Sequence, residues 1–184
     1  NRGYAKNSMG HQCLDIWVSK RVIKNRPSMS VVVSSLLFLA PTASLSQSSE
    51  RKCLAEALYF EARDQGWRGM LAVGIVIQNR VRDPRYPETV CAVVRQGEYR
   101  DGNPVRHKCQ FSYYCDGKPE RPVEKEAWSV ARDLSRLLLT TRLEIVGLES
   151  VTHYHADWVD PPWSKVLEPQ AKIGRHIFYK AEKK

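Results

Sequence analysis

The feature that most constrains the fold is a long apolar segment in the first half of the chain. Residues 67–82 read W-R-G-M-L-A-V-G-I-V-I-Q-N-R-V-R. Met70, Val73 and Ile77 recur at helical spacing, and further apolar residues widen this stripe. A helix that is apolar over so much of its circumference belongs inside a domain. The segment therefore predicts a core helix that stops at Asp83-Pro84.

Three other segments predict helices around this one. Residues 50–63 are rich in helix formers and run into D-Q-G, where Gly66 is expected to cap the helix. Residues 87–96 predict a short helix. Residues 123–139 carry apolar side chains at the spacing of a long helix, which we expect to face the core.

The rest of the chain predicts a small β part. Residues 97–122 are rich in Gly, Pro, Asp and aromatic residues, which favours a loop region with room for a hairpin. Two strand-like stretches follow, S-V-T-H-Y-H and K-I-G-R-H-I-F-Y-K. Helices first and strands afterwards indicate one α+β domain, at residues 50–184.

Five cysteines divide at the start of this domain, because Cys13 precedes it and four lie within it. An even number of cysteines favours two disulfides formed in an oxidising compartment. Cys109 and Cys115 are close in sequence around a short polar-aromatic turn, so we expect them to pair, which leaves Cys53 for Cys91. The alternative is a four-thiolate zinc site, although only one close cysteine pair is present.

Residues 1–49 differ from the domain and predict an export signal. They hold six Lys and Arg residues against one acid, then the apolar residues 31–40, then the small and polar run A-P-T-A-S-L-S-Q. This is the pattern of a secretory signal peptide, with one cleavage point after Ser46. An uncleaved membrane anchor is the alternative. Either reading places the domain in the periplasm or cell envelope.

The charge balance argues against a nucleic-acid partner. The whole chain has 29 basic and 20 acidic residues, a formal net charge of +9. Without residues 1–49 the balance is 23 against 19, or +4. A mild excess with no basic run or Arg-aromatic repeat does not favour nucleic acid, but suits an anionic polymer such as cell wall.

Glu61, in the run Y-F-E-A-R, is the first candidate for chemistry. Its place at the edge of the buried helix face, beside two aromatic residues, would remove water from the carboxyl group. Desolvation raises the pKa of a carboxyl group, as required of the proton donor in glycosidic cleavage. The alternative is a structural ion pair with Arg63 or a more distant arginine.

The run C-Q-F-S-Y-Y-C is the second candidate. A disulfide would pin a loop that presents Gln110, Ser112 and tyrosines, the kinds of group that hold sugars by hydrogen bonds and ring stacking. The alternative is that Phe111 and one tyrosine only fill the core.

The third candidate is T-H-Y-H-A-D-W. His153, His155 and Asp157 alternate, and alternate residues on a strand share one face, so the three could bind a metal ion. The alternative is a strand whose His and Tyr side chains form hydrogen bonds within a cleft.

Six motifs are informative together: C-L-A-E-A-L-Y-F-E-A-R, G-M-L-A-V-G-I-V-I-Q-N-R-V, R-Y-P-E-T-V-C-A-V-V, C-Q-F-S-Y-Y-C-D-G, T-H-Y-H-A-D-W-V-D-P-P-W and I-G-R-H-I-F-Y. In this order they resemble the cell wall hydrolase family of the spore cortex-lytic enzyme SleB, from about Lys52 to Tyr179. The resemblance implies a lysozyme-like α+β domain, mainly helical with a small hairpin part. It also implies lytic transglycosylase activity on peptidoglycan.

The resemblance further implies that Glu61 is the single catalytic carboxyl group. It would protonate the bond between N-acetylmuramic acid and N-acetylglucosamine, then accept a proton from the muramic 6-hydroxyl as a 1,6-anhydro ring closes. The family's usual E-A-R-G-E is here E-A-R-D-Q, so Asp64 and Gln65 depart from the pattern.

By analogy with lysozyme-like clefts, the substrate-binding residues would come from two segments: Gln110, Ser112, Tyr113, His153, Tyr154 and His155. No cofactor or metal is implied. The expected partner is the glycan strand of peptidoglycan, and the chain is expected to act as a monomer. Two alternatives are a zinc-dependent N-acetylmuramoyl-L-alanine amidase and a wall-binding module without catalysis.

Overall fold

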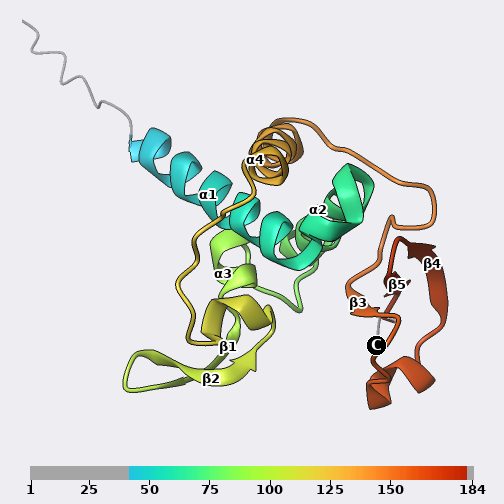
Figure 1. Cartoon of the computed structure of the whole chain (residues 1–184). Helices are drawn as coiled ribbons and strands as arrows, with labels where there is room; N and C mark the ends of the chain where they lie inside the picture. Colours follow the sequence, from blue (N-terminus) through green and yellow to red (C-terminus); the bar gives the residue numbers. More distant parts are fainter. Residues whose placement is uncertain (1–41, 182–184) are drawn as a thin grey trace, which may run out of the picture. The chain divides into compact units, whose positions relative to one another are not determined.

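The computed structural model describes residues 42–181 of the chain, and its helices are arranged as Figure 1 shows. Three long helices supply most of the buried apolar side chains. They are α1 (Thr42–Ala62), α2 (Gly66–Arg82) and α4 (Lys125–Thr140), accompanied by the short α3 (Val90–Val94). None of the described helices is long and apolar enough to cross a bilayer. The fold is the predicted α+β class.

Helix α2 is the core helix that the sequence predicts. Its middle residues are buried almost continuously, and it packs against both α1 and α4. Side chains of both α1 and α4 approach Gly74, where an added Cβ would collide with Leu138 and crowd Leu58. A glycine at this point therefore allows closer packing than any side chain would.

Helix α1 begins at Thr42, upstream of the predicted start at residue 50. The predicted cleavage point after Ser46 thus lies within this helix. Cleavage and the boundary at residues 49 and 50 stay predictions, and most of the predicted export signal lies outside the described residues. At its other end α1 passes into a 3-10 turn, η1 (Arg63–Gln65), and the residue that follows this turn, Gly66, has a φ of 65°. The first helix therefore ends before Gly66, as predicted, but α2 begins directly at this glycine.

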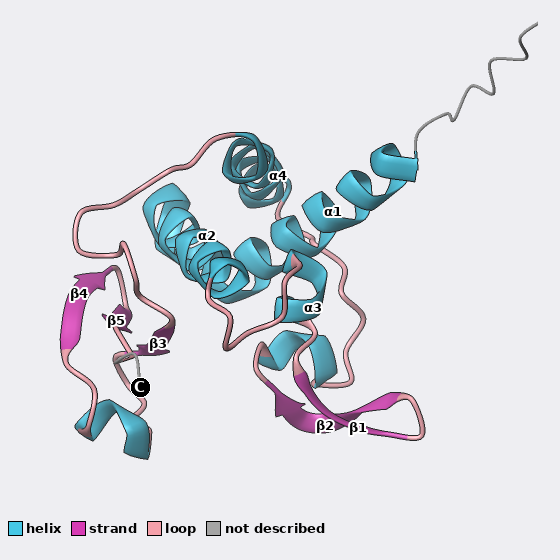
Figure 2. Cartoon of the chain, turned by 180° about the vertical axis from the view of Figure 1, so that it is seen from behind, coloured by secondary structure: helices cyan, strands magenta, loops and turns pink. Residues whose placement is uncertain are grey.

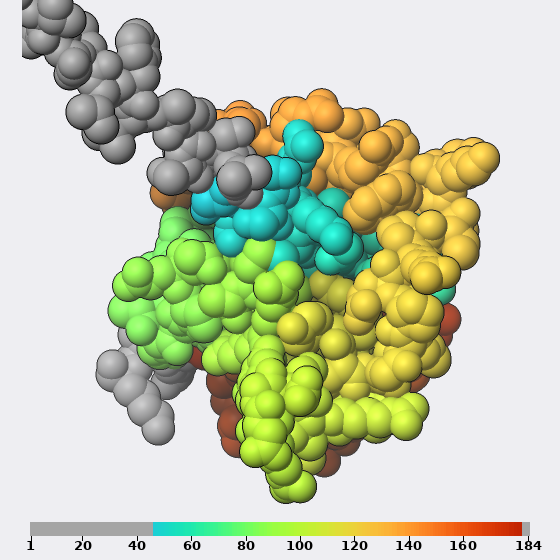
Figure 3. Space-filling model, turned by 90° about the vertical axis from the view of Figure 1, so that its left-hand side faces the viewer, coloured from blue at the N-terminus to red at the C-terminus, as the bar shows by residue number. Residues whose placement is uncertain are grey.

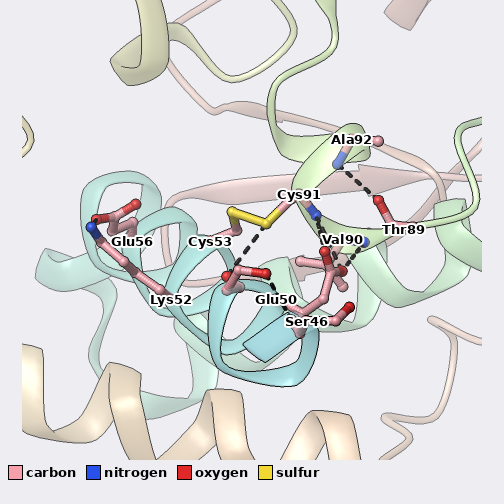
Figure 4. Close-up of a disulfide and its surroundings, with 10 residues drawn as sticks. Ser46, Glu50, Lys52, Cys53, Glu56, Thr89, Val90, Cys91 and Ala92 are labelled. Carbon is pink, nitrogen blue, oxygen red and sulfur yellow. Dashed lines mark hydrogen bonds and ion pairs between the residues drawn. A yellow bond between two sulfur atoms is a disulfide. The ribbon is translucent and has the colours of Figure 1, made fainter. Parts of the chain in front are cut away.

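The disulfide between Cys53 and Cys91 joins α1 to α3, as predicted. Figure 4 shows Glu50 beside it, with its carboxylate at the start of α3. Glu50 Oε2 accepts a hydrogen bond of 2.6 Å from the N–H of Val90. Because the first N–H groups of a helix have no partner inside it, this carboxylate satisfies a donor and complements the helix dipole.

Residues 97–115 contain the predicted hairpin, followed by a loop that the second predicted disulfide closes. Strands β1 (Gly97–Arg100) and β2 (Asn103–Cys109) pair antiparallel around a turn at Asp101-Gly102, where both φ angles are positive. Cys109 pairs with Cys115 at the end of a 3-10 turn, η2 (Ser112–Cys115). In Figure 3 the hairpin (yellow-green) protrudes beside the loop that leads to α4 (yellow).

A three-stranded antiparallel sheet ends the chain, in the order β3 (His153–Ala156), β5 (His176–Tyr179) and β4 (Pro169–Ile173). The second predicted strand, K-I-G-R-H-I-F-Y-K, is in fact two strands. Gly174 lies between them with a φ of 57°, a conformation that turns the chain and that glycine adopts without strain. Figure 2 shows, as does Figure 1, that this sheet and the hairpin lie on either side of the C-terminal end of α1.

Candidate active site

A cleft with a volume of about 810 Å³ lies against the C-terminal end of α1. One wall comes from the disulfide-closed loop after β2 and the segment leading to α4. The other comes from the end of β3 and the residues after it. Five of the six predicted substrate-binding residues line this cleft together with Glu61: Gln110, Ser112, Tyr113, Tyr154 and His155. The structure thus brings together residues that are about ninety positions apart in the sequence.

Glu61 occupies the last turn of α1 and faces the cleft. Burial raises the pKa of its carboxyl group to about 7, even though a hydrogen bond from Tyr154 and the positive charge of Arg80 both favour the ionised form. The Tyr154 hydroxyl donates that hydrogen bond to Oε2 over 2.9 Å. Near neutral pH, Glu61 is therefore balanced between proton donor and proton acceptor.

Arg63 does not pair with Glu61, which contradicts the structural alternative for these two residues. Its guanidinium Nε lies 3.4 Å from Glu124 Oε1 and its charge lies over the ring of Tyr59. Among residues 42–181, no Lys, Arg or His nitrogen lies within 4 Å of the Glu61 carboxylate. The carboxyl group is left available to a ligand.

Arg80 is a site residue that sequence reasoning missed. Its side chain is 2% exposed, and Nε donates a 2.8 Å hydrogen bond to the carbonyl of Thr152, just before β3. The guanidinium also lies against the rings of Tyr86 and Phe111. One arginine thus connects α2 to both walls of the cleft. The sequence did contain a signal for this residue, because Arg80 lies seven positions after Val73 and thus on the buried face of the helix.

The C-Q-F-S-Y-Y-C loop buries aromatic residues and places polar residues in the cleft lining. Phe111 is buried, and Tyr113 is mostly buried, with its ring stacked on Phe60 at 4.9 Å between centroids. Gln110 and Ser112 are exposed and line the cleft. The aromatic residues fix the loop, and the polar residues face the space where a ligand would lie.

His153, His155 and Asp157 do not converge on one point. His153 lies outside the cleft, with its ring on Trp163. Both ring nitrogens of His155 have partners at 2.9 Å, the carbonyl of Ala156 and the hydroxyl of Tyr179.

Asp157 follows the end of β3 and forms an ion pair of 2.9 Å with Lys172. The described residues contain no group of three His, Cys, Asp or Glu side chains that could hold a metal ion.

Comparison with known proteins settles the family. A family model described as cell wall hydrolase matches residues 64–179, more than half of the chain. The chain belongs to the cell wall hydrolase family. The match begins just downstream of Glu61, so the role of that residue rests on its geometry.

Two solved structures and one curated protein are similar to this cell wall hydrolase. The catalytic domain of SleB from Bacillus cereus is 25% identical, with a TM-score of 0.51 over 72% of this chain and 91% of that one. The catalytic domain of the germination-specific lytic transglycosylase SleB from Bacillus anthracis is 26% identical, with a TM-score of 0.53 over 76% and 99%.

The curated protein is the spore cortex-lytic enzyme of Bacillus subtilis strain 168. It is 24% identical over 131 residues, which make up 71% of this chain. The aligned part spans only 37% of the Bacillus subtilis protein. The similarity therefore concerns the hydrolase domain.

Proposed function

We propose that this cell wall hydrolase is a lytic transglycosylase that cuts the glycan strands of peptidoglycan, with Glu61 as its single catalytic carboxyl group. The observation that carries the proposal is a carboxyl group with a pKa of about 7 that faces a cleft and forms no ion pair with any of residues 42–181. The similarity to the Bacillus anthracis lytic transglycosylase supports the same reaction.

Glu61 performs two proton transfers in this reaction. Protonated Glu61 donates to the oxygen that links N-acetylmuramic acid to N-acetylglucosamine, and the bond from that oxygen to C1 breaks. The muramic O6 then bonds to C1 while its proton passes to the Glu61 carboxylate. The carboxyl group is restored, no water is consumed, and the product ends in a 1,6-anhydro ring.

Positions in the cleft lining support the substrate contacts that we propose. Gln110 and Ser112 hydrogen-bond sugar groups, while Tyr113 and His155 shape the surface that the strand meets. Tyr154 orients the Glu61 carboxyl group through its hydroxyl. We assign His153 to the support of its wall through Trp163, because it does not line the cleft.

We also propose that the enzyme is exported to the periplasm or cell envelope, where it acts as a monomer. The two disulfides support an oxidising compartment. Peptidoglycan itself lies outside the cytoplasm, so the proposed substrate and the proposed compartment agree.

Product analysis tests this function. Purified sacculi are digested, and the soluble products are identified by mass spectrometry. The wild type should release anhydro-muropeptides, whereas Glu61→Gln should release less than about a thousandth as much, since the glutamine amide is not an acid near neutral pH. Glu56→Gln is the matched control, because Glu56 is a half-buried carboxylate on the same helix outside the cleft lining.

Other products would contradict the proposal in identifiable ways. Muramic acid separated from L-alanine would indicate an amidase. Reducing muramic ends without the anhydro ring would indicate a hydrolytic glycosidase. Normal activity of folded Glu61→Gln would show that another group donates the proton.

A further inference from the structure

Trp158 is unusual among the residues that line the cleft. It follows β3 and its side chain is 61% exposed, although a tryptophan gains much by burial. The neighbouring Val159 also lines the cleft and is 50% exposed. The proposed proton transfers make no use of either residue. An exposed apolar surface inside a cleft is a place where a ligand can exclude water.

The Trp158 ring is braced from one side. The guanidinium of Arg175 lies 4.4 Å from the ring centroid, well within the range of a cation–π contact. Arg175 Nε is also 3.5 Å from Asp157 Oδ1, and Asp157 is in turn paired with Lys172. Among residues 42–181 no other aromatic ring or cation stacks on Trp158, so the face away from Arg175 has no such partner.

The brace is tied to the catalytic helix as well. The backbone N–H of Arg175 donates a 2.7 Å hydrogen bond to Gln65 Oε1, from the turn that directly follows α1. Gln65 stands where the family usually has Glu, and either side chain offers the oxygen acceptor that this bond requires. Gly174 approaches Gln65 so closely that a Cβ there would collide with it. The position of Arg175 is therefore fixed relative to the helix that carries Glu61.

We propose that Trp158 is a stacking platform for one N-acetylhexosamine ring of the bound glycan strand, held in position by Arg175. The proposal rests on the glycan-cleaving function and adds a binding subsite to it. A pyranose ring presents a flat face of C–H groups, which matches an exposed indole ring, while its hydroxyl and acetamido groups remain in water or meet polar neighbours. Trp158 contacts substrate but takes no part in proton transfer.

Binding to glycan without cleavage tests the platform. The full chain carrying Glu61→Gln is titrated with peptide-free strands of alternating N-acetylglucosamine and N-acetylmuramic acid, and Kd is measured by calorimetry. Adding Trp158→Ala should weaken binding about tenfold, close to 1.4 kcal/mol. Adding Trp158→Phe instead should restore most of the affinity, because phenylalanine keeps a flat ring.

Trp67→Ala is the matched control in the same background. Trp67 is 59% exposed, nearly the same as Trp158, but does not line the cleft. It should leave Kd unchanged. Equal Kd values for Trp158→Ala and Trp67→Ala, with both proteins folded by circular dichroism, would overturn the platform.

The outcomes separate the platform from the proposed reaction. If the strands bind and Trp158→Ala weakens this binding, but the wild type releases no anhydro products, the platform is supported and the transglycosylase reaction is wrong. If anhydro products appear and Trp158→Ala binds normally, only the platform fails. If no variant binds the strands and the wild type does not cleave them, both are wrong.

Discussion

At the scale of single residues, the site depends on a balance around the Glu61 carboxyl group. Burial raises its pKa, whereas the hydrogen bond from Tyr154 and the charge of Arg80 lower it again. Burial and the nearby carboxylate hold the pKa of the Tyr154 phenol well above its usual value, so this hydroxyl remains a donor over the working pH range. Tyr154 therefore positions Glu61 and also sets how easily it gives up its proton.

This balance predicts the effect of Tyr154→Phe on the pH profile. The lost hydrogen bond stabilised the carboxylate, so its removal raises the pKa of Glu61 above about 7. Since the donor must be protonated, kcat/KM falls above that pKa, and the alkaline limb should move to higher pH by about one unit. The control is Tyr99→Phe, which removes a hydroxyl bonded to the Arg95 carbonyl outside the cleft. An alkaline limb that stays in place or moves to lower pH would disprove the link.

At the scale of secondary-structure elements, the last turn of α2 holds the segment between α4 and β3. Asn79 Nδ2 donates two hydrogen bonds, 2.7 Å to the carbonyl of Leu148 and 2.8 Å to that of Val151. Asn79 is buried, so both bonds are sheltered from water. Together with the bond from Arg80 to Thr152, they fix where β3 begins and hence where Tyr154 meets Glu61.

We expect Asn79→Ala to cost about 2 kcal/mol of unfolding free energy, because the buried carbonyl of Val151 loses its donor and that of Leu148 keeps only the 3.3 Å bond from the N–H of Val151. Urea denaturation measures the loss, with activity falling in the same variant as β3 shifts. Gln78→Ala is the matched control, since Gln78 is the neighbouring residue and its side-chain nitrogen Nε2 has no hydrogen-bond partner in the described part of the chain. A cost for Asn79→Ala no greater than that for Gln78→Ala would contradict this account.

The same elements show what sequence reasoning could reach. The periodic apolar residues of α1, α2 and α4 predicted these helices because packing against one core imposes a local repeat. The position of Glu61 at the edge of a buried face similarly predicted a raised pKa, which the structure confirms. The bonds of Asn79 leave no local pattern, since they join residues 69 and 72 positions apart. The turn at Gly174 was missed because a strand-like composition continues on both sides of it.

At the scale of the whole molecule, the two disulfides constrain different things. Cys53 and Cys91 are 38 residues apart and connect two helices of the core. Cys109 and Cys115 are only 6 apart and close a loop that forms part of the cleft wall. Loop-closure entropy stabilises more when the closed loop is longer, so the first bond should matter more for stability and the second for the shape of the site.

Double alanine variants separate these two roles. Replacing Cys53 and Cys91 should lower the unfolding free energy by about 4 kcal/mol, against about 2 kcal/mol for Cys109 and Cys115, as loop length dictates. Urea denaturation measures both. Muropeptide release, measured at a temperature where each variant is fully folded, should be nearly normal for the first variant and reduced for the second, because residues 110–114 lose their fixed position. A larger loss of unfolding free energy for Cys109 and Cys115 would show that the short disulfide stabilises the core more than the long one. A larger loss of muropeptide release for Cys53 and Cys91 would show that the cleft wall keeps its shape without the short disulfide.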